Sequence, residues 1–568
     1  MSRRDAALAS VALVALVFAA FQPALSAEFQ THWDDNYNLL SNERFRGFAP
    51  DNLRWMATGF LLGHWHPLTW LSFAFDHALH GMDPAGYHLT NVVLHAACAV
   101  LVFFVSRAVL RAAGSPAAER VLPSLAVAAL FAVHPLRVES VAWITERRDV
   151  LSGAFLLGSV LAWMRLRADG ARAFYWIALA LFAGSLMSKA WGLTLPAVLL
   201  VLDAWPLRRF GREPLSRLLL EKAPFALLAL GAAVLAFRAQ AASGAMDYAA
   251  GFSPAQKAAQ ACFGLCYYVA RTVWPADLLP VYALDTALDP GDLRFVLSFV
   301  GVAAAAIACV ALRRRAPALA AACAVYAIVV SPVLGLTQSG VQLVADRYSF
   351  LATIPLALLL APPIGALQRR ASTAAAGGVV AVLALVLIVA TRSYAKVWHD
   401  SRTLFTYASE TDPTEWYPWN ELGTMAFQDG DVPRALTLYD RAIACDDRAW
   451  FAYEKRGIAR MNVGDTDGAI ADYGRAIELY PHSPIAFVNR GGLRMQARDY
   501  AGARDDFERA LDADPDNEGA WLMLGNARLR LDDAPGAIEA LDRAIELAGE
   551  GSPVAPQAER LLDEARAR

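Results

Sequence analysis

The stretch VVAVLALVLIVA, from Val379 to Ala390, decides the fold class of this chain. It belongs to an apolar segment close to the ~20 residues that a helix needs to cross a bilayer. Comparable runs such as Ala6–Ala20 and Leu193–Val201 also lie before about residue 395, and charged residues become dense only after that point. The sequence therefore predicts a membrane part followed by a water-exposed part.

The composition supports a membrane protein. The chain has 568 residues, of which 57% are hydrophobic and 18% charged, and this is too apolar for a soluble multidomain protein. The formal net charge is −3, and no long Lys/Arg run occurs outside the turns that flank the apolar segments, so we expect no nucleic-acid partner. The six cysteines form no disulfide or metal framework.

Eleven membrane spans are predicted. The first apolar stretch ends near Ala27, and we interpret it as a retained anchor rather than a cleaved signal peptide because many further spans follow. The other ten lie near residues 87–110, 120–134, 149–166, 172–187, 190–206, 222–239, 293–311, 317–337, 347–366 and 374–391.

The basic residues at the span ends test this count. Most of them share one face, as the positive-inside rule requires, only if the segment 256–280 is a re-entrant or interfacial helix and does not cross. The N-terminus is then cytoplasmic and the C-terminal part lies outside. Four basic residues fall on the outer face, where the positive-inside rule does not explain them: Arg147, Arg148, Lys189 and Arg347. These four are candidates for function.

A repeat of 34 residues begins at Trp416. Glycines recur at 423, 457, 491 and 525, and alanines recur with the same step from Ala435 and from Ala442. This period is typical of a tetratricopeptide array, in which small residues let paired helices approach closely while Tyr439, Tyr473, Phe507 and Leu541 fill the space between repeats. Four repeats predict a concave binding surface.

The fold class that follows is all-α: a polytopic helical membrane domain of about eleven spans, then a periplasmic tetratricopeptide-repeat solenoid. We expect a membrane domain at 1–395, with the first extracytoplasmic loop at 27–86, and a linker or initial helix at 396–415. Four repeats then occupy 416–550, and a C-terminal capping helix occupies 551–568.

The first predicted outer loop begins with the paired carboxylates Asp34 and Asp35, which we expect in an exposed loop near the membrane surface. A carboxylate there would suit deprotonation of an acceptor hydroxyl, or a metal site, in transfer from a polyprenyl-phosphate sugar. A helix cap or an Asx turn explains the pair equally well. His64, His66 and His88 in and after this loop are supporting candidates, although structural histidines are commoner and their spacing matches no closed zinc pattern. We predict no metal ligands, and a divalent metal is left open.

The second predicted outer loop mixes both charges and contains Glu139, Glu146, Arg147 and Arg148. Mutual ion pairing is the simplest interpretation of such a loop. Because Lys189 and the pair Asp346-Arg347 come at two other outer span ends, converging cations that hold a phosphate leaving group are the functional interpretation. We therefore predict that Lys189 and Arg347 share one cavity with Asp34.

Several motifs resemble the transmembrane and tetratricopeptide-repeat-containing O-mannosyltransferases, membrane glycosyltransferases of the GT-C fold, and indicate a bacterial relative. The motifs are Trp65-His66-Pro67-Leu68-Thr69-Trp70, His88-Leu89-Thr90-Asn91 with His95, Leu130–Leu136 running into Val138–Trp143, Met187-Ser188-Lys189, Leu202–Leu207 and Asp346-Arg347-Tyr348.

This resemblance implies that an acidic residue of the first outer loop is catalytic, which maps to Asp34 or Asp35. It also implies basic residues that hold the lipid phosphate, for which Arg147, Lys189 and Arg347 are the mapped candidates. The implied activity moves mannose or another hexose from a polyprenyl-phosphate donor to an extracytoplasmic protein Ser/Thr hydroxyl recruited by the repeats. The implied location is a bacterial inner membrane with the repeats in the periplasm.

Two other functional classes compete with this hypothesis. A membrane-anchored scaffold without catalysis would explain the repeats, but one span would suffice for an anchor and the polar outer loops would have no role. A transporter or polymerase-type enzyme with an appended binding module is the third hypothesis.

Overall fold

The computed structural model describes all residues except 1, 243–251, 285–287, 336–341 and 550. It is built almost wholly of helices, and the chain divides into two compact units, Met1–Tyr407 and Ala408–Arg568. The boundary falls inside helix α19 (Ser401–Thr411). The predicted all-α fold with a repeat solenoid is confirmed.

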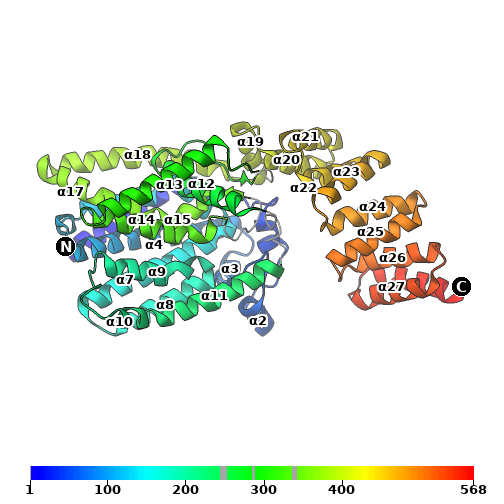
Figure 1. Cartoon of the computed structure of the whole chain (residues 1–568), viewed down its shortest axis with the longest axis horizontal. Coiled ribbons are helices and arrows are strands. Elements are labelled where there is room, and N and C mark those ends of the chain that lie inside the picture. The colour runs from blue at the N-terminus through cyan, green and yellow to red at the C-terminus, as the bar shows by residue number, and fades with distance from the viewer. Residues whose placement is uncertain (1, 243–251, 285–287, 336–341, 550) are drawn as a thin grey trace. The chain divides into compact units, whose positions relative to one another are not determined.

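The first unit contains eighteen complete α-helices and two short strands within the described residues (Figure 1). The helices are α1 (Arg3–Phe21), α2 (Pro50–Thr58), α3 (Pro67–His80), α4 (Pro84–Ala112), α5 (Leu122–Ala132), α6 (Val138–Ala142), α7 (Arg147–Asp169), α8 (Ala173–Ser188), α9 (Leu195–Ala204), α10 (Leu215–Leu220), α11 (Ala223–Ala242), α12 (Pro254–Val273), α13 (Leu293–Leu312), α14 (Pro317–Val330), α15 (Ser349–Ala352), α16 (Ile354–Ala357), α17 (Ala361–Arg370) and α18 (Thr373–Val397). The strands β1 (Tyr282–Ala283) and β2 (Gln342–Val344) pair antiparallel.

Each of the eleven predicted spans has a helical counterpart. Among the described residues, six helices are long and apolar enough to cross a membrane, and two bent helix pairs pass the same test together. Three shorter apolar helices, Ala173–Ser188, Ala190–Ala204 and Pro317–Val333, account for the rest. The protein is a multi-pass membrane protein by these helices, and the number of crossings and the side of each loop stay predictions.

The segment expected to be re-entrant or interfacial forms α12, which begins at a Ser253 capping box and ends before Trp274. It does not reach the hydropathy of the candidate spans. Its buried residues, among them Gly264 and Tyr268, lie on one stripe, as an amphipathic helix requires.

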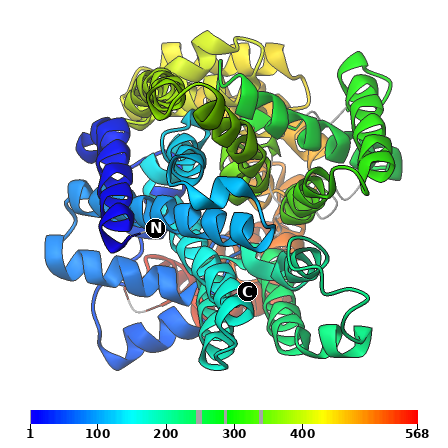
Figure 2. The same cartoon turned by 90° about the vertical axis from the view of Figure 1, so that its left-hand side faces the viewer.

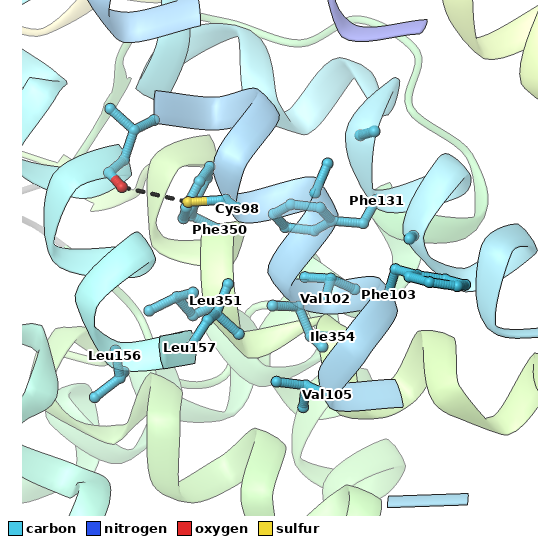
Figure 3. Packing of buried hydrophobic residues seen from close by; sticks show 14 of the residues in the cluster. Cys98, Val102, Phe103, Val105, Phe131, Leu156, Leu157, Phe350, Leu351 and Ile354 are labelled. Atoms are coloured by element: carbon cyan, nitrogen blue, oxygen red, sulfur yellow. Dashed lines mark hydrogen bonds between the residues drawn. The ribbon is translucent and has the colours of Figure 1, made fainter. Parts of the chain in front are cut away.

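The core of the first unit lies where α4, α7 and the bent pair α5–α6 meet. Figure 2 views the chain from the side on which the N-terminus lies. α7 packs on α8 and α4, and Cys98 of α4 donates to the carbonyl oxygen of Val150 over 3.3 Å. Figure 3 shows this contact with the rings of Phe131 and Phe350 nearby. Gly153 of α7 admits Phe350, because a Cβ at Gly153 would lie 2.8 Å from that ring.

The second unit is a solenoid of helix pairs closed by one further helix. The pairs are α20 (Trp416–Gln428) with α21 (Val432–Cys445), α22 (Trp450–Asn462) with α23 (Thr466–Leu479), α24 (Pro484–Gln496) with α25 (Tyr500–Ala513) and α26 (Glu518–Arg530) with α27 (Ala534–Leu547), followed by α28 (Val554–Ala567). The second helix of every pair begins at an aspartate whose side chain accepts from a backbone N–H three residues on: Asp431, Asp465, Asp499 and Asp533.

The repeated glycines have the role that their period predicts. A Cβ at Gly491 would lie 2.7 Å from the Phe507 ring, and one at Gly457 would lie 2.8 Å from Tyr473. Both contacts join the two helices of one repeat. Each large residue lies sixteen residues after its glycine, on the partner helix of the same repeat, and it also packs with the next repeat: Phe507 shares a buried cluster with Ala520 of α26, and Tyr439 with Ala459 of α22. The large residues therefore fill the space between repeats, as expected, as well as the space inside each repeat.

Two adjacent glycines of α24 give a matched test of this packing. We predict that Gly491→Ala lowers the free energy of unfolding of the repeat array by about 1–3 kcal/mol, since the new methyl group overlaps Phe507. Gly492→Ala is the control because nothing lies within 4 Å of its Cβ position, and it should be neutral or gain up to about 1 kcal/mol in helix propensity. Urea denaturation of the purified full chain, followed by pulse proteolysis of the array, measures both, and equal effects would reject the packing role.

Candidate functional site

The stretch that follows α1 is fixed to the end of α18 and to the start of α19. Gln30 donates through Nε2 to the carbonyl oxygen of Trp398 over 2.9 Å, and its Oε1 accepts from the Ser401 hydroxyl at 3.3 Å. Trp33 stacks on Trp398 and Phe405, with ring centroids 6.0 and 5.6 Å apart. These contacts hold the backbone of the acidic pair in one place.

The two aspartates point in different directions because consecutive residues of a helical turn differ by about 100°. Asp35 is fully buried, and it accepts from the Thr145 N–H at 3.0 Å, the Thr145 hydroxyl at 2.6 Å and the Gln30 N–H at 2.9 Å. Burial raises the pKa of Asp35 to about 6, and these hydrogen bonds oppose that rise. The expectation of an exposed carboxylate is wrong for Asp35, which joins the first loop to the residue before Glu146.

Asp34 is the accessible member of the pair, with 31% of its side chain exposed, and its Oδ2 lies 3.8 Å from Nη2 of Arg148. Partial burial of the Asp34 carboxyl raises its pKa above the ordinary value and Glu146 raises it further, while Arg148 and Arg347 lower it. Of the two aspartates, only Asp34 has the accessibility that a general base requires.

Glu146 connects the charged residues. It is fully buried, and its carboxylate contacts Nη2 of Arg148 at 2.6 Å, Nζ of Lys189 at 2.8 Å and Nε of Arg347 at 3.5 Å. Lys189 also pairs with Asp149, and Arg347 pairs with Glu139. We call these seven residues the ionic cluster: Asp34, Glu139, Glu146, Arg148, Asp149, Lys189 and Arg347.

The cluster gathers residues from distant parts of the sequence at one end of the bundle. Lys189 follows the last residue of α8, and Arg347 lies in the 3-10 turn Asp346–Tyr348. The predicted convergence of Lys189 and Arg347 is present, since both contact Glu146, whose partner Arg148 contacts Asp34. A cavity shared by all three residues stays a prediction.

Arg147 lies outside the cluster. Its guanidinium pairs with Asp76, donates to Asn91 Oδ1 at 2.7 Å and to the Tyr87 carbonyl oxygen at 2.7 Å, and stacks over the Phe73 ring. These contacts fix Arg147 to α3 and α4. The motif residue Thr90 completes the arrangement by donating to Asp76 at 2.8 Å.

Two of the supporting histidines lie beside the cluster. His66 caps the start of α3, and its ring stacks on Trp70 with centroids 4.7 Å apart. Burial lowers the pKa of His66 to about 3 and that of His64 well below the ordinary value, and Arg148 and Lys189 lower both further. Both rings are therefore neutral at pH 7. His88 is buried in α4 beside Ala27 and Glu28, away from the cluster.

Polar atoms without a partner point to a place for a ligand. Within the described residues, Nη1 of Arg148 and Nδ1 of His66 are buried and make no hydrogen bond. A buried donor left unsatisfied costs about 1–3 kcal/mol, so an anion or a hydroxyl bound here would recover that energy. No group of three His, Cys, Asp or Glu side chains in the described part of the chain is arranged to hold a metal ion.

Asp346 lies behind the cluster. Its Oδ1 accepts from the hydroxyls of Tyr267 and Tyr282 at 2.8 and 3.2 Å, which joins α12 and β1 to the turn that carries Arg347. Glu139 accepts from the Arg347 N–H at 2.7 Å and so fixes the same turn to α6. Both acids therefore hold Arg347 in position.

The sequence did not single out Glu146, Asp149 or Asp76 as site residues, although each is buried and paired. A signal existed, because ionisable residues beside long apolar runs are rare unless they pair or face a polar cavity. Which cation each acid contacts could not be derived, since the partners come from separate helices.

The fold and the site define a class: a multi-pass α-helical membrane protein with a buried ionic cluster and a tetratricopeptide-repeat solenoid. The tetratricopeptide family model matches residues 398–449, 454–518 and 493–552.

Several curated proteins are similar to part of this chain. Protein O-mannosyl-transferase Tmtc1 of Drosophila melanogaster is 36% identical over 159 residues, which cover 27% of this chain and 17% of that protein. Protein O-mannosyl-transferase TMTC2 of Mus musculus is 33% identical over 218 residues, which cover 36% of this chain and 24% of that protein. The chain spans no more than a quarter of the length of either. The resemblance to these O-mannosyltransferases is confirmed.

Solved structures similar to the chain include MamA, at 19% identity over 26% of this chain and 80% of that one, with a TM-score of 0.24. The tetratricopeptide-repeat domain of Sgt2 from Aspergillus fumigatus is 30% identical, covers 21% of this chain and 77% of that one, and has a TM-score of 0.20.

The bridging role of Asp35 leads to a stability prediction. We expect Asp35→Ala to destabilise the membrane unit by about 1–3 kcal/mol, because the N–H groups of Gln30 and Thr145 lose their acceptor inside the protein. Asp34→Ala is the matched control and should change stability by less than about 0.5 kcal/mol, since its carboxylate is partly exposed. Thermal unfolding of the full chain in detergent measures both, and an equal loss in the two variants would contradict the assignment.

Proposed function

We propose that this chain is a membrane glycosyltransferase that moves mannose or another hexose from a polyprenyl-phosphate donor to a protein hydroxyl. The observation that carries the proposal is the ionic cluster, in which an accessible carboxylate lies beside cations that converge from three other segments. Relatives that share up to 36% identity are named protein O-mannosyl-transferases, which supports the same class of reaction. The proposed location is the cytoplasmic membrane of a bacterium, with the repeats in the periplasm.

Asp34 is the general base in this proposal. The acceptor hydroxyl gives its proton to the Asp34 carboxylate while its oxygen forms a bond to the anomeric carbon of the sugar. The bond between that carbon and the phosphate oxygen breaks, and its electron pair leaves with the phosphate. Attack opposite the leaving group inverts the anomeric carbon.

The leaving phosphate gains negative charge, and cations placed before the reaction stabilise that charge at low reorganisation cost. Arg148 is the best placed, because its Nη1 has no acceptor among the described residues while its other nitrogens hold Glu146. Neutral His66 can donate a hydrogen bond to the same anion. Lys189 and Arg347 complete the cationic side, and Arg147 acts as a positioning residue at the start of α7.

Glu146 must compete with the phosphate for these cations. Glu146 is shared among Arg148, Lys189 and Arg347. Lys189 also pairs with the buried Asp149 and Arg347 with the buried Glu139, whereas the second carboxylate near Arg148 is the partly exposed Asp34 at 3.8 Å, so Arg148 is the cation that the buried acids neutralise least. A buried charge network of this kind costs desolvation energy and fixes geometry in return. We propose that Glu146 orients the three cations and that the donor phosphate binds on their open side.

The first test is Asp34→Asn, which keeps the shape of the side chain and removes its basicity. We expect transfer to fall by roughly 10²–10⁴-fold, the range for loss of a general base, with unchanged thermal stability. Transfer is measured with purified full chain, radiolabelled polyprenyl-phosphate mannose and a Ser/Thr-containing acceptor protein. Full activity in this variant would remove Asp34 from the mechanism.

The pH dependence provides a second readout of the same base. Asp34 acts only as the carboxylate, and burial raises its pKa, so transfer should decline as the pH falls through a value above the ordinary aspartate range. Asp34→Glu should retain measurable transfer with a shifted acidic limb, which a purely structural residue would not cause. An acidic limb that is identical in the wild type and in Asp34→Glu would assign the titration to another group.

The repeats are proposed to recruit the protein acceptor, because solenoids of this class supply extended surface rather than chemistry. Deleting residues 416–568 should leave transfer to a short acceptor peptide unchanged and lower transfer to the intact acceptor protein by tenfold or more. Both acceptors are assayed with the same donor and the same detergent. Equal transfer to the intact acceptor by the full and the shortened chain would show that the repeats dock an unrelated partner.

A further inference from the structure

Arg137 is a buried cation that the proposed mechanism does not use. It ends the 3-10 turn Pro135–Arg137 at the break between α5 and α6, and it is 1% exposed. Within the described residues no carboxylate pairs with it, and its Nε and Nη1 are buried without a hydrogen-bond partner. A charge removed from water is costly unless it is paired, and an apolar residue of similar size would cost less here. This cost indicates a role that depends on the direction of its hydrogen bonds.

The side-chain hydrogen bonds that Arg137 makes in the described part of the chain go to one helical turn. Its Nη2 donates to the hydroxyl of Ser349 over 2.9 Å and to that of Thr353 over 3.3 Å. Ser349 begins α15 and Thr353 follows its last residue, so the two hydroxyls lie on one side of the turn. The Ser349 hydroxyl in turn donates over 2.7 Å to the carbonyl oxygen of Asp346, the residue before Arg347. Two successive hydrogen bonds therefore connect Arg137 to the turn that carries Arg347.

Two phenylalanine rings stabilise the guanidinium between α5 and α15. Its central carbon lies 5.4 Å from the centroid of the Phe131 ring and 5.6 Å from that of the Phe350 ring. The two rings pack edge to face, with their centroids 5.5 Å apart. A cation over an aromatic face is attracted by the ring, and this attraction replaces part of the missing ion pair. The rings thus stabilise Arg137 in the place where it reaches α15.

The turn that carries Arg347 is held from both sides by one short segment. Glu139, two residues after Arg137, accepts from the Arg347 N–H at 2.7 Å and pairs with its guanidinium. Arg137 holds the residues that follow the turn, Ser349 and Thr353. Glu139 is a member of the ionic cluster, whereas Arg137 has no ion pair or hydrogen bond with a side chain of the cluster among the described residues. Arg137 can therefore influence the cluster through the position of this turn.

We propose that Arg137 is a positioning residue for Arg347: through Ser349 and Thr353 it holds the turn where the Arg347 guanidinium reaches both Glu146 and the donor phosphate. The inference rests on the proposed function for the identity of the anion, a lipid monophosphate. Without Arg137 the start of α15 is released, and the Arg347 guanidinium moves away from the phosphate. A misplacement of about 1 Å can lower a rate about 10²-fold.

A second buried arginine provides the matched control. Arg107 of α4 donates to two neutral acceptors, the carbonyl oxygens of Ala118 and Arg120, and it also lies over a phenylalanine ring. None of these contacts involves α15. Arg137→Met and Arg107→Met therefore remove the same kind of side chain, but only the first releases the turn of Arg347.

The first measurement is amide hydrogen exchange of the full chain in detergent. In Arg137→Met the peptide that covers residues 346–353 should exchange at least tenfold faster than in the wild type, because the hydrogen bonds that fix α15 are lost. In Arg107→Met this peptide should exchange as in the wild type. Unchanged exchange in Arg137→Met, or an equal rise in both variants, would overturn the proposal.

The second measurement separates the phosphate from the lipid chain. The affinity of the full chain for undecaprenyl phosphate, divided by its affinity for undecaprenol, gives the contribution of the phosphate. This ratio should fall about tenfold or more in Arg137→Met, stay unchanged in Arg107→Met, and lie between the two in Arg137→Lys, which keeps one donor for Ser349. A general loss of structure lowers both affinities and leaves the ratio unchanged, so an unchanged ratio in Arg137→Met would contradict the positioning role.

The route through α15 has its own test. Ser349→Ala combined with Thr353→Val should reproduce most of the fall in this ratio, because the acceptors of Arg137 are gone. Adding Arg137→Met to that double variant should then cause little further loss, since the three residues act as one unit. Fully additive effects would show that Arg137 does not act through these hydroxyls.

The two proposals fail separately. If exchange and the affinity ratio change as expected but the wild type transfers no sugar, the positioning role stands and the glycosyltransferase proposal fails. If the wild type transfers sugar and Arg137→Met keeps the wild-type ratio and the wild-type KM for the donor, the glycosyltransferase proposal stands and the positioning role is overturned.

Discussion

The sharing of one buried carboxylate, Glu146, among three cations is the interaction on which the membrane unit depends. Arg148, Lys189 and Arg347 come from three different segments, and each contacts Glu146 within 3.5 Å. A charge removed from water is tolerated only when it is paired, and removing one partner leaves the others uncompensated. The cluster therefore fixes the ends of α7, α8 and α15 relative to one another.

The helices that supply the cluster are interrupted, and the interruptions make it possible. The span that contains α5 and α6 bends by 59° at a break before Pro135, and the one that contains α15 bends by 54° near Thr353. In a straight helix the axial position and the direction of each side chain are fixed by the helix geometry. A break removes this constraint and lets Glu139 and Arg347 point toward each other. Pro135 stands directly after the first break, where proline is tolerated, and Gly153 of α7 leaves room for Phe350 of α15.

The geometry of the cluster and its surroundings divides the charged residues into those that hold backbone segments in place and those that remain available to a ligand. Asp35, Glu139 and Asp346 are fully buried and hold backbone segments, and Arg147 is fixed by Asp76 and Asn91. Asp34, Arg148 and His66 differ because each retains an accessible surface or an unsatisfied nitrogen. Residues of one type, adjacent in sequence, thus have unlike roles, and the pairs Asp34/Asp35 and Arg147/Arg148 are the clearest cases.

The sequence by itself determined the apolar helices and the 34-residue repeat. It also determined the four basic residues that the positive-inside rule does not explain: Arg147, Arg148, Lys189 and Arg347. These follow from local properties: hydrophobic length, helix periodicity and the packing of small against large side chains every thirty-four residues. Only the tertiary structure decided that Asp35 and Arg147 face inward and that Glu146 is the common partner of three cations. The physical reason is that these facts depend on the rotation and bending of helices packed against neighbours distant in sequence, which no local pattern contains.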